Sequence, residues 1–515
     1  MSGMNSWNAG YVTDVEYTHG YYTELNPVRM RHALVAQGYA PPQVRTAFEL
    51  GYGQGISTNL HAAASSTQWW GNDFNPAQAA FASAMADDAG TGARMLEDSF
   101  EELLARDDLP TFDFIGLHGI WSWVSDDNRR AMVEFIRRKL QPGGTVYVSY
   151  NTQPGWAAFV PMRQLIKAHI ERISPQAATS AERSSGALQF AQRLMDTRPV
   201  YAAANPLVAE RLKKLTNQDP NYLAHEYLNR DWAPMPVTEV AQWLEGAKLQ
   251  FGTHANFTDL VDLVNLSNEQ QSLLAEVSDP AFRQLVRDFI LNTQFRKDYW
   301  IKGLRRMAAP EHLAALSALR VQMLSEPASV SHKVQGAQGE MSLSPHLMGP
   351  VIEALAPGKI RSLGEVLQDL APKGIPLGHL SQVVSLLIGA GHMVPVADES
   401  AIEAAATRAH RFNRHVLNQS RWRADLSFMA SPVTGGGVAI NRFEQLFLLA
   451  REEGSSEPEA WARFAWAVLS SQGVRLIHEG KAADTPEQNV ALLLAQARAL
   501  KSQRLPLLQR LGVAH

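Results

Sequence analysis

Three glycines at alternate positions are the feature of this sequence whose residue type and spacing point most directly to chemistry. An apolar run at 44–50 ends directly before Gly51, Gly53 and Gly55, and a helix-like pattern resumes at Ser57. Glycine adopts backbone dihedrals that other residues rarely reach, and it lets a ligand come close where a Cβ would block it. A strand, a glycine-rich turn and a helix start therefore predict the first βα unit of a nucleotide-binding α/β sheet.

The spacing of these glycines narrows the class of ligand. A dinucleotide fingerprint, G-x-G-x-x-G, would need glycine at position 56 or 58, where the chain has Ile56 and Thr58. A nicotinamide oxidoreductase is therefore disfavoured. What remains is Glu49 followed by G-x-G-x-G, which resembles motif I of the class I S-adenosylmethionine-dependent methyltransferases. The resemblance implies S-adenosylmethionine as cofactor, with Glu49 either ordering the glycine turn or lying near the cofactor's amino group.

Acidic residues follow the next two predicted strands. Asp73 ends the strand at 68–72, where its carboxylate can accept hydrogen bonds from ribose hydroxyls. Asp98 follows a strand at 94–97, and an Asp at this point of the methyltransferase pattern pairs with the adenine amino group. The resemblance also implies apolar contact of Phe74 or Phe100 with the adenine face. The set expected to bind the cofactor is Glu49, Gly51, Tyr52, Gly53, Gly55, Asp73, Phe74, Asp98, Ser99, Phe100 and His118.

A more specific resemblance follows the fourth and fifth predicted strands, at 112–117 and 145–149. Residues 149–156 read Ser-Tyr-Asn-Thr-Gln-Pro-Gly-Trp, which is similar to a segment of bacterial methyltransferases that carry a methyltransferase regulatory domain. His118-Gly119 and a tyrosine-rich arm ending at Asn26-Pro27 look like the same subgroup. The position after the fourth strand borders the methyl-transfer centre in this fold, so His118 is expected there.

This subgroup includes rickettsial protein-lysine methyltransferases, so the resemblance favours the side-chain amine of a protein lysine as acceptor. Only the neutral amine attacks, and deprotonating a lysine at pH 7 costs about 4–5 kcal/mol unless the site is apolar or a proton acceptor is present. The expected catalytic residues are His118, Tyr150, Asn151 and Tyr17, and His118 is the group that normally titrates near neutrality. A wider acceptor pocket is expected from Tyr17, Tyr21, Tyr22, His118, Trp121, Trp123, Tyr150, Asn151 and Trp156.

Two other functions are open at this point. An O-methyltransferase of a glycan or small molecule would need a general base such as His118, and its pH profile would follow that base. A non-catalytic protein that keeps the fold for interaction has no need of a complete cofactor site. The joint presence of Glu49, the three glycines, Asp73 and Asp98 argues against the second alternative.

The bulk composition sets wider limits. A chain of 515 residues predicts two to four domains, and a net charge of −4 offers no general attraction to nucleic acid or anionic membranes. The absence of cysteine excludes disulfides, thiolate metal sites and cysteine nucleophiles, and no metal is expected. Neither a signal peptide nor a long apolar run is visible, so we expect a cytoplasmic protein that does not insert into membranes.

The expected architecture is a Rossmann-like α/β methyltransferase domain followed by mostly α-helical regulatory and winged-helix-like C-terminal domains. The boundaries are an aromatic arm at 1–30, the methyltransferase domain at 31–175, a helical regulatory domain at 176–325, a linker at 326–345 and the C-terminal domain at 346–515. A polar break is expected at 174–186. The large C-terminal half suggests a macromolecular acceptor, because small substrates seldom need so much extra surface. A protein acceptor and no nucleic acid are expected as partners, and a homo-oligomer is compatible with the sequence.

Overall fold

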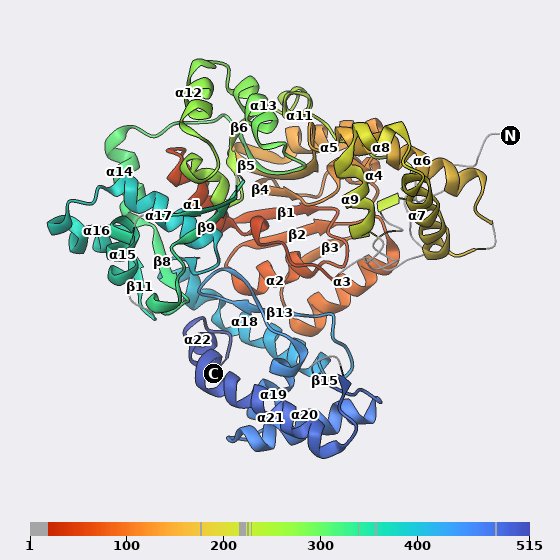
Figure 1. Ribbon diagram of the computed structural model, residues 1–515. Helices are drawn as coiled ribbons and strands as arrows, with labels where there is room; N and C mark the ends of the chain where they lie inside the picture. The colour runs from red at the N-terminus through yellow and green to blue at the C-terminus, as the bar shows by residue number, and fades with distance from the viewer. Residues whose placement is uncertain are drawn as a thin grey trace.

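A seven-stranded sheet forms the centre of the computed structural model, which describes residues 19–514 except 176–177, 216–222, 224–225, 228, 338, 344, 356–357 and 479–480. Its strands are β1 (Thr46–Leu50), β2 (Gln68–Asn72), β3 (Arg94–Leu96), β4 (Phe112–Leu117), β5 (Leu140–Asn151), β6 (Leu249–His254) and β7 (Phe295–Lys302). Their spatial order is β3-β2-β1-β4-β5-β7-β6 (Figure 1). The first five strands, all expected from the sequence, are confirmed, and β5 begins earlier than expected, at Leu140.

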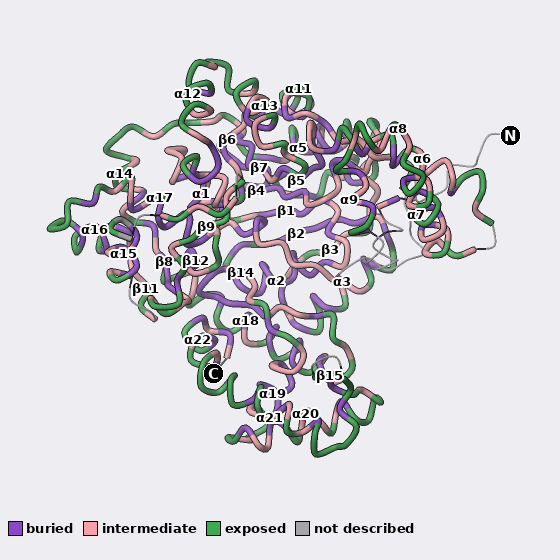
Figure 2. The backbone as a smooth tube through the Cα atoms, viewed as in Figure 1, coloured by how far each residue is buried: buried purple, intermediate pink, exposed green. Residues whose placement is uncertain are grey.

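The first five strands run parallel, whereas β7 is antiparallel to both β5 and β6. The parallel strands are connected through α2 (Ile56–Ala64), α3 (Pro76–Ala89), α4 (Phe100–Ala105) and α5 (Asp126–Lys139). Helices on both faces bury the central strands almost completely, which Figure 2 shows as mostly purple tube. Such burial explains why the centres of these strands are rich in apolar and aromatic residues.

The segment expected to be a helical regulatory domain, 176–325, also supplies two strands of the central sheet. β7 pairs with β5 over seven residue pairs, from Thr145 opposite Ile301 to Asn151 opposite Phe295, and β6 adds to the outer edge of β7. Its helices include α11 (Val237–Glu245), α12 (Asn268–Glu276) and α13 (Pro280–Leu291). The segment is therefore helical for the most part, as expected, and in addition two of its apolar runs pair with the edge of the central sheet.

A small helical cluster follows β5 and has an apolar core of its own. It contains α6 (Val160–Arg172), α7 (Ser180–Asp196), α8 (Val200–Ala204) and α9 (Pro206–Leu215), which lie together on the right in Figure 1. The polar break expected at 174–186 ends early, because α7 begins at Ser180. Thr179 and Glu182 form a capping box there, which satisfies free backbone N–H groups at the helix start.

The region expected to resemble a winged helix has a three-stranded antiparallel sheet, β11-β8-β12. The strands are β8 (Arg320–Met323), β11 (Ile360–Ser362) and β12 (Met393–Val396), and the helices are α14 (Ala309–Ala318), α15 (Pro345–Ala354), α16 (Leu363–Leu370) and α17 (Leu377–Gly389). The sheet therefore crosses the boundary expected at 325–326. The expected linker also contains a hairpin, β9 (Lys333–Gly336) with β10 (Gly339–Ser342).

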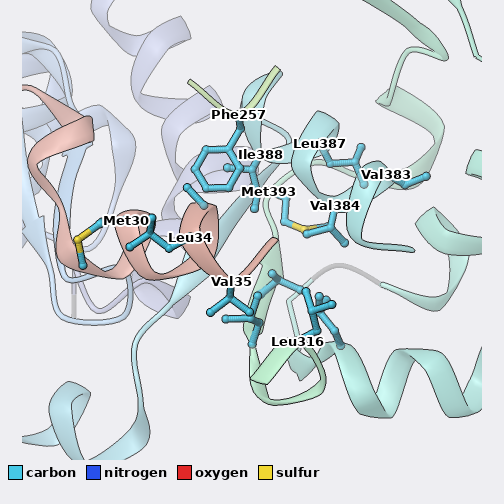
Figure 3. Close-up of a cluster of buried hydrophobic side chains, with 14 of the residues drawn as sticks. Met30, Leu34, Val35, Phe257, Leu316, Val383, Val384, Leu387, Ile388 and Met393 are labelled. Carbon is cyan, nitrogen blue, oxygen red and sulfur yellow. The ribbon is translucent and has the colours of Figure 1, made fainter. Parts of the chain in front are cut away.

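Helix α1 (Pro27–Ala36) joins this region to the central sheet. Figure 3 shows Met30, Leu34 and Val35 of α1 in one buried cluster with Phe257, Leu316 and Met393. The same apolar core contains residues of the central sheet, such as Phe114 and Tyr147. The winged-helix-like region is therefore packed against the catalytic domain through a shared core.

The C-terminal part packs against α2 and α3, which cover one face of the central sheet. It comprises α18 (Glu399–Gln419), β13 (Phe428–Ser431), β14 (Gly436–Ala439), α19 (Arg442–Glu452), α20 (Pro458–Ser471), β15 (Ile477–His478), β16 (Lys481–Ala482), α21 (Pro486–Ala499) and α22 (Leu505–Arg510). A second apolar core combines Leu60 and Met85 with Phe412 of α18. Figure 1 shows α18 directly beneath α2. Among the described residues, no helix is long and apolar enough to cross a membrane.

Candidate functional site

The glycine turn has the backbone conformation that its sequence predicts. Gly51, Gly53 and Gly55 have φ values of 68°, 58° and 69°, all in the left-handed region that favours glycine. Neighbouring side chains also require the absence of a Cβ. A Cβ on Gly51 would lie 2.8 Å from Ile120 Cγ2, and one on Gly55 would lie 2.5 Å from Ala82 Cβ. The turn therefore connects β1 to α2, and the side chains of Ile120 and Ala82 pack directly against its backbone.

Two buried carboxylates hold this turn. Asp73 accepts hydrogen bonds from the Gly53 N–H at 2.9 Å and from the Asn75 N–H at 3.0 Å, one on each carboxylate oxygen. The Thr58 hydroxyl donates to Glu49 at the end of β1. Burial raises the pKa of Asp73 to about 6 and that of Glu49 to about 8. Glu49 is therefore mostly protonated at neutral pH in the protein without a bound ligand.

Asp98 is positioned beside Asp73 by the end of β2. The Asn72 side-chain amide donates to the Asp98 carbonyl at 2.7 Å, and the Asp98 N–H donates to Asn72 Oδ1 at 2.9 Å. The Asp98 carboxylate pairs with Arg106 at 3.0 Å. Ser99 caps α4 in a capping box with Glu102, so its hydroxyl contacts the helix start. The carboxyl ends of β1, β2 and β3 thus bring together the acidic residues expected from the sequence.

The expected aromatic contacts of the cofactor lie at different depths. The Tyr52 hydroxyl donates to the Leu96 carbonyl at 2.8 Å, and its buried ring packs with Ala82 and Met95. Phe100 is half-buried against the core beneath α4, and Phe74 is half-buried directly after Asp73. Tyr52 therefore braces β3 against the glycine turn, while Phe74 and Phe100 keep part of their surface exposed.

His118 follows β4 and lies in an aromatic environment. Its Nδ1 is 2.9 Å from the Tyr147 hydroxyl, and the Tyr22 ring stacks on it with ring centroids 3.5 Å apart and planes inclined by 16°. The Gly119 N–H donates to Ser149 Oγ at 2.8 Å. Burial lowers the pKa of His118 to about 3, so its imidazole is neutral at physiological pH.

An ion pair next to His118 was not found by sequence reasoning. Lys297 Nζ lies 2.5 Å from Glu24 Oε1, and the Tyr299 hydroxyl donates to the Glu24 carbonyl at 2.7 Å. Burial opposes ionisation of Glu24, but the positive charge of Lys297 outweighs it and lowers the Glu24 pKa. The signal in the sequence is the period-two pattern of β7, which places Lys297 and Tyr299 on the same face.

The register of β5 and β7 explains why Tyr147 rather than Tyr150 contacts His118. Tyr147 lies opposite Tyr299, whereas Tyr150 lies opposite Arg296, so the two tyrosines face opposite sides of the sheet. The Tyr150 hydroxyl donates to Asp298 at 2.9 Å and is fully buried. The position of Tyr150 does not support its expected contact with the acceptor.

Asp298 belongs to a buried charged network on that second face. Arg296 Nε lies 2.7 Å from Asp298 Oδ2, and Arg296 Nη1 lies 2.7 Å from Asp288 Oδ1. His254 Nδ1 is 3.1 Å from Asp298 Oδ1. The network fixes β7 between β5 and α13, and Tyr150 forms part of it.

The other members of the expected acceptor pocket are divided among several places. Asn151 is buried, and its backbone N–H donates to Ser122 Oγ at 2.9 Å. Trp121 is fully buried, while Trp123 and Trp156 pack around Trp232. Tyr21 packs against Phe428 of β13, and Tyr17 lies outside the described residues. Tyr22 and His118 are the described members whose rings are stacked together.

A cleft of about 490 Å³ lies away from this chemistry. Its lining includes Val44 and Thr67, which precede β1 and β2, together with Arg31 of α1 and Asp398. Parallel strands carry the glycine turn, Asp73 and His118 at their carboxyl ends, whereas this cleft is at their amino ends. Ligands of open α/β sheets bind outside the carboxyl ends, so the position of the chemical groups outweighs the size of this cleft.

The fold and the glycine turn define a Rossmann-like methyltransferase, and comparison with known proteins agrees. Residues 47–144 match the family described as "Methyltransferase domain", and residues 219–302 match the family described as "Predicted methyltransferase regulatory domain". Over 514 residues the chain is 41% identical to an uncharacterised protein of Synechocystis sp., covering 99% of this chain and 100% of the relative. The chain belongs to the S-adenosylmethionine-dependent methyltransferases that carry this regulatory domain.

Two further comparisons extend the likeness to Rickettsia. The fold matches that of PKMT2 from Rickettsia typhi, solved in complex with AdoHcy, with a TM-score of 0.68 and 16% identity over 97% of this chain and 99% of that chain. An uncharacterised protein of Rickettsia prowazekii is 26% identical over 219 residues, which is 42% of this chain and 86% of that protein. The match with PKMT2 shows one common fold over nearly the whole length of both chains.

Proposed function

We propose that the glycine turn and the acidic residues around it bind S-adenosylmethionine. The turn presents backbone without side chains, and Asp73 is held next to it by the Gly53 N–H. Each carboxylate oxygen has two lone pairs, so Asp73 can accept ribose hydroxyls while keeping its two backbone hydrogen bonds. Asp98 would contact the adenine amino group, and Glu49 would lie near the cofactor's amino group. The bound cofactor would supply a methyl group on a positively charged sulfur.

We propose that the acceptor is the side-chain amine of a protein lysine. The observation that carries this proposal is the neutral His118, covered by Tyr22 and bonded to Tyr147. A hydroxyl acceptor would need a base strong enough to take its proton, and an imidazole with a pKa of about 3 is a weak one. An amine needs no such base once it has lost its proton, because its lone pair attacks directly.

The surroundings of His118 favour the neutral form of an amine. The aromatic faces of Tyr22 and Tyr147 around His118 would disfavour an ammonium ion, so the pKa of a lysine entering this region would fall. The proton would leave to water before attack. The nitrogen lone pair would then form the new N–C bond as the bond between the methyl group and the cofactor sulfur breaks, which leaves the sulfur as a neutral thioether. The common fold with PKMT2 and the large C-terminal half also support a protein acceptor.

Transfer of labelled methyl groups tests both parts of the proposal. Wild-type protein and the Asp73→Asn variant are incubated with methyl-labelled S-adenosylmethionine and separated protein and glycan fractions of a bacterial lysate. We expect label in protein, recovered as methyl-lysine after complete hydrolysis, and loss of this label with Asp73→Asn. Label confined to glycan or small molecules would replace the lysine proposal with O-methylation. Binding without any transfer would favour an interaction protein that keeps the fold.

A further inference from the structure

A short arm, residues 19–26, contacts two parts of the molecule. One is the acceptor region, which we define as His118 with the surrounding Tyr22 and Tyr147, and the other is the C-terminal hairpin formed by β13 and β14. Tyr22 stacks on His118, and its backbone N–H donates to Ser57 Oγ at 2.9 Å. The adjacent Tyr21 lies between His61 and Phe428, with ring centroids 5.2 Å and 5.1 Å away. Two consecutive side chains therefore reach two parts of the molecule that are far apart in sequence.

The first two residues of β14 receive Tyr21 in a glycine socket, which we define as Gly436 and Gly437. A Cβ on Gly436 would lie 2.5 Å from the Tyr21 hydroxyl oxygen, and a Cβ on Gly437 would lie 3.0 Å from Tyr21 Cε1. The Asn26 side-chain amide donates to the Thr434 carbonyl at 2.9 Å beside the socket. Side chains on these glycines would collide with Tyr21, so the close fit depends on their absence.

The backbone conformation links the position of one tyrosine to that of the other. Tyr22 is extended, with φ −116° and ψ 103°, so the side chains of Tyr21 and Tyr22 point to different sides of the arm. Downstream of Tyr22, Leu25 packs where a Cβ on Gly116 would lie 2.2 Å from its Cδ2, and Glu24 pairs with Lys297. On the N-terminal side of Tyr22, Tyr21 fixes the arm through its contacts with His61 and Phe428. Tyr22 is therefore fixed between contacts on both sides.

We propose that Tyr21, seated in the glycine socket, is a positioning residue that holds Tyr22 over His118. The C-terminal hairpin thereby sets the shape of the acceptor region without touching it. This inference rests on the proposed function of His118 and Tyr22 in the acceptor region. It adds that the C-terminal half controls methyl transfer through the position of Tyr21 in the arm, separately from cofactor binding.

Chemical modification of His118 tests the inference without a known acceptor. Diethyl pyrocarbonate modifies neutral imidazoles, and the stacked Tyr22 ring protects His118 in the wild type. In Gly437→Ala, the added methyl group would lie 2.9 Å from Leu60 Cδ1 and 3.0 Å from Tyr21 Cε1, so we expect both side chains to shift. With Tyr21 displaced, His118 modification, followed by mass spectrometry, should become about tenfold faster. Gly378→Ala is the matched control, because a Cβ there meets no described atom within 4 Å. Tyr21→Phe keeps the ring and should keep the protection.

A double-mutant cycle separates positioning from a general loss of structure. If Gly437→Ala acts through Tyr21, it should have no further effect on His118 in a Tyr21→Ala background. Tyr21→Ala alone also serves if Gly437→Ala does not fold. Calorimetry with S-adenosylmethionine should give affinities within about twofold of wild type for all variants. The rate of methyl transfer to the lysate protein fraction should fall about tenfold in Gly437→Ala and Tyr21→Ala, but not in Tyr21→Phe or Gly378→Ala.

Two results would have different meanings. Unchanged His118 reactivity in both Gly437→Ala and Tyr21→Ala would overturn the inference, because the downstream contacts of Glu24 and Leu25 would then suffice to hold Tyr22. Failure of the wild-type protein to bind S-adenosylmethionine would instead overturn the proposed function, whatever the reactivity of His118.

Discussion

Binding of S-adenosylmethionine should release a proton from Glu49. This side chain is 1% exposed, accepts a hydrogen bond from Thr58, and has its pKa raised to about 8 by burial. The cofactor's amino group is positively charged, and a positive charge beside a carboxylate lowers the carboxylate's pKa. Glu49 should therefore change from mostly protonated to ionised when the cofactor binds.

The expected size of the effect follows from the shifted pKa. With a pKa of about 8, Glu49 is about 91% protonated at pH 7, so binding should release about 0.9 proton if the pKa returns to its ordinary range. The sign is that affinity increases with pH. Between pH 6 and pH 7 the binding constant should rise about ninefold, which corresponds to about 1.3 kcal/mol.

Titration calorimetry at pH 7 in buffers of different ionisation enthalpy measures the number of protons released. Glu49→Gln is the matched control, because its amide oxygen can still accept the Thr58 hydroxyl but it carries no titrating proton. The variant should release about 0.9 proton less than the wild type, and its affinity should lose most of the ninefold rise. Equal proton release from the two proteins would refute the placement of Glu49 near the cofactor's charge.

Three other substitutions test the site and the sheet. Asp73→Asn should weaken S-adenosylmethionine binding about tenfold or more in calorimetry, because the amide can no longer accept from both Gly53 and Asn75; unchanged affinity would contradict the ribose assignment. Tyr150→Phe should lower the free energy of unfolding by about 1.5–3 kcal/mol through loss of its hydrogen bond to a buried carboxylate, with kcat unchanged; a large fall in kcat at wild-type stability would restore a catalytic role. Arg296→Met should cost about 3–5 kcal/mol in denaturant unfolding, because two buried carboxylates lose their partner; a neutral effect would show that they become protonated at little cost.

The sequence alone predicts the cofactor end of the fold well. The glycine turn is a local structure, because positive φ values and close packing at Gly51 and Gly55 leave few alternatives to glycine. Asp73 directly follows the short strand β2, and Asp98 comes two residues after the end of β3. Parallel strands gather such ends at one edge of a sheet, so chain order was sufficient to bring these carboxylates together. Their individual roles toward the cofactor stay predictions.

The acceptor end depends on pairings that local pattern cannot supply. Tyr147 and Tyr150 are both aromatic residues of one strand, and their faces were decided by the register of β5 against β7, a strand that sequence reasoning placed in a separate helical domain. Register matters because a shift of one residue exchanges the two faces of a strand.

The expected cytoplasmic location and the oligomeric state also stay predictions.

Local residue types thus determined the glycine turn, the strand ends and the absence of cysteine chemistry. The tertiary structure decided which groups surround His118. Glu24 and Lys297 are 273 residues apart in sequence, yet they form an ion pair beside it, and Tyr21 meets a glycine socket supplied by the C-terminal hairpin. The physical reason is that turn conformation and strand burial are properties of a few neighbouring residues. Contacts across the sheet depend instead on the packing of the whole chain.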